Sequence, residues 1–147
     1  MVDMDGNGGL GDVVTCRKDI VYDTLGGYLT GVKHANGRDW WIVCNESFTN
    51  KYYKILVTPD TMMVSEQQIG PVFDTTSWSG QSNFSNDGNW YARADATTGV
   101  VVMQFDRCTG MFSNPIHDTM LTMQFGGVGF SSNNKFMYVF TWLDLYQ

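Results

Sequence analysis

Short apolar runs alternate along this chain with clusters of Asn, Gly, Asp and Ser. The runs at 40–44 (WWIVC), 54–58, 90–94 and 100–105 are rich in β-branched and aromatic residues and have the length of β-strands. The polar clusters between them carry the residues that form turns. No amphipathic segment of useful helical length interrupts this alternation. The pattern therefore predicts an all-β protein made of short antiparallel strands.

One unit of this pattern occurs three times, as a polar turn that runs directly into an aromatic-rich strand. The copies are residues 34–41 (HANGRDWW), 84–91 (FSNDGNWY) and 130–138 (FSSNNKFMY). They start at positions 34, 84 and 130, so the steps are 50 and 46 residues. A repeat of about 40–50 residues that contains β-strands is typical of propeller blades. We therefore predict about three blades, each a four-stranded antiparallel sheet.

The repeat divides the 147 residues into one propeller segment with two whole and two partial units. Natural propellers close with roughly four to eight blades. Three blades leave two open edges, which favour pairing with other strands. The chain is therefore expected to be a fragment of a larger propeller or a unit that closes by self-association. The predicted boundaries are 1–33 (partial), 34–83, 84–129 and 130–147 (partial).

Composition narrows the classes of partner. The net charge is −6 and no cluster of Lys or Arg is visible, which argues against a nucleic-acid partner. No run of 18 or more apolar residues is present, so we expect no membrane insertion, and the first residues do not form a signal peptide. Cys16, Cys44 and Cys108 lack the spacing of metal ligands, and we expect them to be buried free thiols.

The repeats resemble a known family. Residues 32–43 (VKHANGRDWWIV) resemble a blade start in large secreted β-propeller proteins of Bacteroidetes, in which the propeller precedes adhesion-type and sorting modules. Residues 84–88 and 130–134 resemble the F-S-P-D-G turn of WD40-like repeats, and residues 103–110 (MQFDRCTG) are similar to the strand end of such blades. The resemblance implies a secreted or cell-surface protein. It supplies no catalytic residues.

His34 and Asp39 flank the first repeat turn and are the first candidate site. A histidine and a carboxylate so close in sequence can act as a base and the group that orients it. However, Phe84 and Phe130 take the place of His34 in our alignment of the other copies. This favours a role in holding the blade together, with contact to a ligand as the alternative. His117 and Asp118 are expected in a surface turn.

Calcium is a second candidate. Asp3, Asp5, Asn7 and Asp12 alternate with glycines, as oxygen ligands do in short calcium loops. The acidic residue that would complete an EF-hand is missing, because position 14 is valine. A glycine-rich turn at the entrance to a blade explains the same residues. We therefore expect no cofactor, with calcium as the alternative.

Tryptophan is abundant. We expect Trp40, Trp41, Trp90 and Trp142 to pack between blades, because they follow the repeat. Trp78 lies outside the repeat in a Ser- and Gly-rich loop and is a candidate for ligand contact.

No catalytic motif is recognisable in the chain. The leading hypothesis is therefore a non-catalytic binding or scaffold module that recognises a protein or glycan through its blade loops. The alternative is a fragment of a propeller enzyme, such as a lactonase or a glycan-active hydrolase, with part of its site in other blades. A homo-oligomer that closes the propeller is a further expectation.

Overall fold

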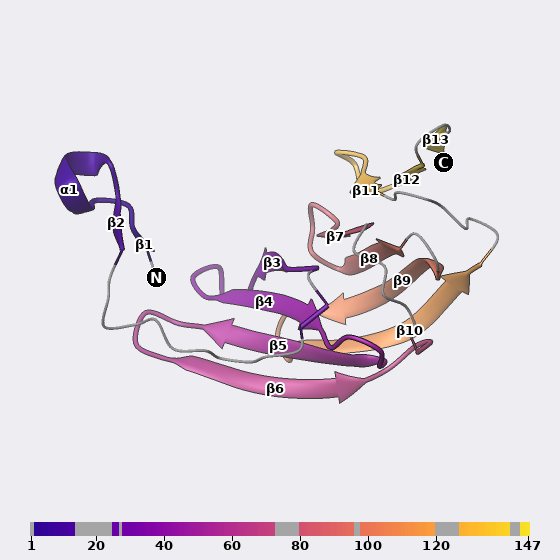
Figure 1. The fold of residues 1–147 in the computed structure, drawn as a ribbon, viewed down its shortest axis with the longest axis horizontal. Helices are drawn as coiled ribbons and strands as arrows, with labels where there is room; N and C mark the ends of the chain where they lie inside the picture. Colours follow the sequence, from indigo (N-terminus) through magenta and orange to yellow (C-terminus); the bar gives the residue numbers. More distant parts are fainter. Residues whose placement is uncertain are drawn as a thin grey trace.

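A computed structural model describes residues 2–13, 25–26, 28–72, 80–95, 98–119, 127–141 and 145–147. Within these residues the chain forms three antiparallel sheets of four, four and three strands, together with a small N-terminal hairpin. Figure 1 shows the three sheets following one another in chain order, with the hairpin at the far side of blade 1. The predicted partial propeller is confirmed.

The sheets are here called blades 1, 2 and 3. In each blade the strands lie side by side in chain order, so neighbouring strands in sequence are neighbours in the sheet. The first strands of the three blades, β3, β7 and β11, lie next to one another, as the inner strands of a propeller do (Figure 1). The bounds are β3 Thr30–Lys33, β4 Trp40–Asn45, β5 Lys51–Val57 and β6 Met62–Gln68 in blade 1; β7 Gly80–Phe84, β8 Trp90–Asp95, β9 Gly99–Asp106 and β10 Met111–Asp118 in blade 2; and β11 Gly127–Phe130, β12 Met137–Phe140 and β13 Leu145–Tyr146 in blade 3.

The N-terminal hairpin pairs β1 (Val2–Asp3) with β2 (Asp12–Val13) around the short helical turn α1 (Gly6–Gly9). Asn7 and Gly8 have φ values of 51° and 68° there, so the turn is irregular. No described helix is long or apolar enough to cross a membrane.

Two apolar clusters fill the spaces between the blades. The cluster between blades 1 and 2, here called seam 1–2, is built mainly from aromatic rings and larger aliphatic side chains. The cluster between blades 2 and 3, seam 2–3, is built mainly from alanine and valine. Seam 1–2 contains Val32, Trp41, Val43, Tyr52, Phe84, Tyr91, Val101, Met103, Phe105 and Phe112, and seam 2–3 contains Ala92, Ala94, Val100, Val128 and Val139.

The repeat turns are equivalent in their backbone hydrogen bonds, and these bonds correct our sequence alignment. The amide of His34 donates to the carbonyl of Asp39, as Ser85 does to Trp90 and Ser131 does to Phe136. His34 therefore corresponds to Ser85 and Ser131 rather than to Phe84 and Phe130. The sequence alignment was therefore shifted by one residue. It matched His34 with Phe84 and Phe130, whereas the equivalent hydrogen bonds in those two turns begin at the next residues, Ser85 and Ser131.

Strand β10 also differs from the prediction. We expected His117 and Asp118 in a surface turn, but β10 continues to Asp118, and His117 pairs with Val101. The register shifts between Ser113 and Ile116, so Pro115 sits in a bulge of an edge strand, where its missing N–H does no harm.

Two further expectations were wrong. Trp40 is 47% exposed although it follows the repeat, because it points away from seam 1–2 while Trp41 points into it. Cys108 is exposed, since it lies in the turn after β9, whereas Cys44 is buried as predicted. Both described cysteines are free, and Cys16 and Trp142 lie outside the described residues.

Candidate functional site

A buried ionic cluster lies where β8 ends, at the opposite end of the strands from the repeat turns. Arg93 and Asp95 are two residues apart on β8, so both side chains point into seam 1–2. They are 3% and 1% exposed. The Nη2 atom of Arg93 donates to Oδ2 of Asp95 at 3.3 Å. We call this pair, together with Tyr28, the ionic cluster.

Tyr28 approaches the pair from the segment before β3. Its hydroxyl donates to the same Oδ2 atom of Asp95 at 3.0 Å, and the Arg93 guanidinium carbon lies 4.5 Å from the centre of its ring. The other oxygen, Oδ1, accepts a bond from the amide of Thr98 at 3.3 Å. The carboxylate is thus bonded by a cation, a phenol and a backbone amide. Such charge-assisted bonds are stronger than neutral ones.

Gly80 makes the approach of Tyr28 possible. A Cβ atom at Gly80 would lie 2.8 Å from the Tyr28 hydroxyl oxygen and closer still to the carbonyl of Ala94. Only glycine leaves room there for the ring to reach Asp95. The start of β7 is therefore shaped to admit the cluster.

The side chains around the cluster are shielded from solvent. The rings of Tyr52 and Tyr91 are fully buried and meet edge to face at 5.9 Å. Burial raises the pKa of both phenols above the ordinary value, although the positive charge of Arg93 opposes the shift. Electrostatic interactions are stronger in such a setting than in water. The ionic cluster can therefore hold a fixed charge distribution at this end of the seam.

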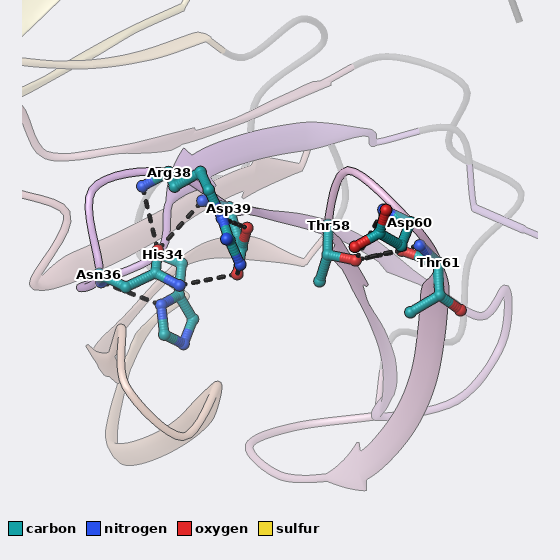
Figure 2. A network of polar contacts seen from close by, with 7 residues as sticks. All are labelled: His34, Asn36, Arg38, Asp39, Thr58, Asp60 and Thr61. Carbon is teal, nitrogen blue, oxygen red and sulfur yellow. Dashed lines mark hydrogen bonds and ion pairs between the residues drawn. The ribbon is translucent and has the colours of Figure 1, made fainter.

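The repeat turn of blade 1 lies at the other end of the sheet and contains His34 and Asp39 (Figure 2). Nδ1 of His34 accepts the amide of Asn36 at 3.0 Å, and Nε2 lies 3.1 Å from the carbonyl of Cys108. One neutral tautomer satisfies both contacts, with Nε2–H donating to the carbonyl. His34 therefore ties blade 1 to the turn after β9.

Asp39 uses its carboxylate within the same turn. It accepts bonds from Nε of Arg38 at 2.8 Å and from Nδ2 of Asn36 at 2.7 Å (Figure 2). The Arg38 bond, followed by the Asn36 bond, lowers the pKa of Asp39. His34 and Asp39 thus share Asn36 as a neighbour but no bond is recorded between their side chains. Figure 2 also shows the turn after β5, where Oγ1 of Thr58 accepts the amide of Thr61 at 3.0 Å.

The calcium candidates lie in the N-terminal hairpin. Oδ1 of Asp3 accepts the amide of Asp5 at 3.0 Å, and Asp3 and Asp12 are cross-strand partners. Asn7 lies in the turn between them. Within the described ranges, no three His, Cys, Asp or Glu side chains come together to hold a metal ion. Trp78 lies outside the described residues.

Two shallow grooves border Trp90 on the side of blade 2 that faces blade 3. One has a volume of about 260 Å³ and includes Asn89, Gln104 and Asp106. The other has a volume of about 270 Å³ and includes Phe130 and Phe136. Trp90 belongs to both, so it is only partly buried rather than a full member of the core. These grooves are open surfaces, unlike the closed ionic cluster.

Sequence reasoning missed the ionic cluster. A strand read as WYARAD places Arg93 and Asp95 on one face together with Tyr91. Charged residues rarely face a core unless they are paired. Two opposite charges at i and i+2 in an otherwise apolar strand would have identified the pair, but Tyr28 could not be found in this way, because it is 67 residues away.

Comparison with known proteins gives one informative match. No protein-family model matches the chain, and neither does any curated protein. Among solved structures, the crystal structure of a putative 6-phosphogluconolactonase from Bacteroides uniformis matches with a TM-score of 0.50 and 15% identity. The match covers 74% of this chain and 32% of the other, so the chain spans about a third of the length of that protein. It shows a shared fold.

The match also corrects our leading functional hypothesis. We expected a non-catalytic binding or scaffold module, but the propeller that matches carries the name of an enzyme. The comparison thus favours the alternative, an enzyme fragment. It gives no sign of WD40 repeats or adhesion modules. The comparisons therefore show that this chain has the fold of a partial β-propeller, similar to part of the Bacteroides uniformis structure.

Proposed function

We propose that the chain is part of a β-propeller hydrolase that opens the lactone ring of a sugar acid. One observation carries the proposal, namely the match of 74% of the chain to the Bacteroides uniformis structure. A fold supports many chemistries, so the proposal also needs suitable groups in this chain. Among the described residues, the ionic cluster is the feature best suited to hold such groups in position.

Lactone hydrolysis adds water to a cyclic ester and releases a carboxylic acid. The reaction needs a group that accepts a proton from water and a group that stabilises the negative charge on the carbonyl oxygen. Both demands are met by charges held in a fixed arrangement away from bulk water. Arg93 and Asp95 are such charges, and they lie at the end of blade 2 opposite the repeat turns.

Because the cluster is closed, we assign it a positioning role. Asp95 is bonded on both of its oxygens, and its exposed fraction is 1%. It holds β8, the segment before β3 and the turn after β8 in one arrangement. In this proposal the ionic cluster fixes the framework, and the groups that touch the lactone lie outside it.

The test is hydrolysis of 6-phosphogluconolactone, measured by titrating the released acid at constant pH. The wild-type protein should exceed the spontaneous rate. Asp95→Asn keeps the size of the side chain and removes its charge, so we expect kcat to fall at least roughly tenfold. Arg38→Ala is the matched control, because it disrupts an Arg–Asp pair at the other end of the sheets, and its kcat should not change.

A double variant separates function from stability. Arg93→Met with Asp95→Leu replaces the ion pair with apolar side chains, which often preserves stability. A folded double variant without activity would support the proposal. Folded wild-type protein that leaves the lactone at its spontaneous rate contradicts it, as does full activity in the folded double variant.

A further inference from the structure

One face of blade 1 is apolar and, in the part of the chain that the structure describes, partly exposed. Cross-strand partners point to the same side of a sheet, so the register places Trp40, Val57 and Met62 in one row of this face. Ile42, Ile55 and Val64 form the next row. Trp40 and Met62 are each 47% exposed and Val64 is 40% exposed. We call these six side chains the open face of blade 1.

The internal repeat shows what such a face normally contacts. The turn hydrogen bonds make Trp40 equivalent to Tyr91 in blade 2 and to Met137 in blade 3. Tyr91 is fully buried against blade 1, and Met137 packs against the core of seam 2–3. In blades 2 and 3 this face is therefore covered by the preceding blade. The open face of blade 1 has the same position and no such partner among the described residues.

In blade 3 it is the opposite face that carries exposed apolar side chains among the described residues. Phe140 and Leu145 are cross-strand partners, and they are 51% and 69% exposed. By the same equivalence Phe140 corresponds to Val43 in blade 1 and to Ala94 in blade 2. Both of those residues are 0% exposed, because the following blade covers them. We call Phe140 and Leu145 the open face of blade 3.

Within the described residues, blades 1 and 3 thus present two complementary halves of one type of interface. We propose that two copies of this chain join head to tail, with the open face of blade 3 in each copy packing on the open face of blade 1 in the other. Two contacts of this kind close a ring of six blades, which lies within the roughly four to eight blades of natural propellers. Three copies would give nine blades, outside that range.

The chemistry of the open faces supports association. Contiguous exposed apolar surface is uncommon in monomers and marks interaction sites. Trp40 sits in the first row of its face, and tryptophan is enriched among the residues that dominate binding energy. Lys33 lies beside it, with Nζ 5.7 Å from the ring centre. An apolar centre with a charged neighbour at the rim is the usual composition of a specific interface.

The first test is the mass in solution by light scattering after size exclusion, over a wide range of concentrations. A closed ring has a mass of 33 kDa, twice the 16.5 kDa of one chain. Trp40→Asp and Phe140→Asp should each raise the dimer dissociation constant at least roughly tenfold. Ile116→Asp is the control: Ile116 is 60% exposed on β10 but belongs to neither open face, and its mass should not change.

Mixing the two variants gives the sharper result. Trp40→Asp protein keeps its blade 3 face, and Phe140→Asp protein keeps its blade 1 face, so an equimolar mixture can form one intact contact. We expect the mixture to dimerise more tightly than either variant alone. An isologous interface would not show this recovery.

Other outcomes contradict the ring. A wild-type mass of 16.5 kDa at all concentrations would mean that these faces take another occupant. A dimer that survives both substitutions would place the interface elsewhere, and a mass that keeps growing would indicate an open chain of copies. Mass and lactone hydrolysis are measured on the same samples, so this proposal and the proposed function can fail separately. An inactive dimer contradicts only the proposed function. An active monomer contradicts only the ring.

Discussion

The two seams between the blades have the same architecture but opposite composition. Seam 1–2 packs aromatic rings such as Phe105 and Phe112, whose centres are 4.9 Å apart, and it also buries Arg93 and Asp95. Seam 2–3 is filled by alanine and valine, and no buried charge is recorded among its described members. The difference shows that blade packing requires only apolar shape. Packing between blades therefore does not explain why seam 1–2 also buries the charges of Arg93 and Asp95.

The largest expected effect comes from the aromatic seam. Phe112 is 3% exposed and contacts the rings of Tyr52, Tyr91 and Phe105. Phe112→Ala should lower the free energy of unfolding by about 3–5 kcal/mol, because it leaves a cavity among rigid rings. Val139→Ala in seam 2–3 should cost less, roughly 1.5–3 kcal/mol. Urea unfolding of both variants measures the difference, and equal losses would mean that the seams contribute alike.

The ionic cluster should respond almost as strongly to the loss of one partner. Asp95→Ala leaves the Arg93 guanidinium buried without its carboxylate, which costs about 3–5 kcal/mol. The double variant Arg93→Met, Asp95→Leu should recover most of that stability. If it remains as unstable as the single variant, the pair is needed for packing and the contrast between the seams is weaker than we infer.

A smaller effect, which depends on pH, is expected at Lys54. This residue is 1% exposed in seam 1–2, where Nζ lies 3.3 Å from Oε1 of Gln67, and burial lowers its pKa. Between the lowered pKa and the ordinary value near 10.5 the unfolded chain binds more protons than the folded one. Stability should therefore rise with pH in that window.

Lys54→Met removes this dependence and serves as the comparison. Its stability advantage over the wild type should be largest below the lowered pKa and should shrink as pH approaches 10.5. Urea unfolding at a series of alkaline pH values measures this. A constant difference between the two proteins would show that Lys54 keeps an ordinary pKa in the folded state.

The smallest effect compares two equivalent turns. Gly37 and Gly88 both have positive φ, at 76° and 73°. A Cβ at Gly37 meets nothing within 4 Å, whereas one at Gly88 would lie 2.6 Å from Cγ2 of Val32 across seam 1–2. Gly37→Ala should therefore cost about 1 kcal/mol from backbone strain alone, and Gly88→Ala should cost more. Thermal unfolding of the two variants makes the comparison.

The sequence predicted the elements whose signals are local. The runs at 40–44, 90–94 and 100–105 became β4, β8 and β9, because β-branched and aromatic composition and flanking turns are visible within each run. The full outer strand β10 was not predicted, and His117 and Asp118 were expected in a turn, because Pro115 suggests a break and only the bulge explains how an edge strand accommodates it.

The site was less predictable than the fold. His34 and Asp39 stood out because they are chemically conspicuous within one turn, yet their bonds hold that turn and its neighbour together. Arg93, Asp95 and Tyr28 were overlooked because their importance comes from a contact across 67 residues. Which face of a strand is buried decides whether a charge is ordinary or costly. The residues around Trp40 do not show which face of β4 is buried, because that depends on contacts between blades.

The side chain of Gln67 pairs with the backbone of β10 as a neighbouring strand would. Its side-chain amide donates to the carbonyl of Phe112 at 2.8 Å and accepts the amide of the same residue at 3.0 Å, so it occupies hydrogen-bonding groups that an edge strand would otherwise offer to another chain. Deamidation to glutamate would remove the donor and place a negative charge against the Phe112 carbonyl, while bringing a carboxylate to Lys54. Deamidation of Gln67 would thus replace its contact with the Phe112 backbone by an ion pair with Lys54. The edge of β10 would then be free to pair with other molecules.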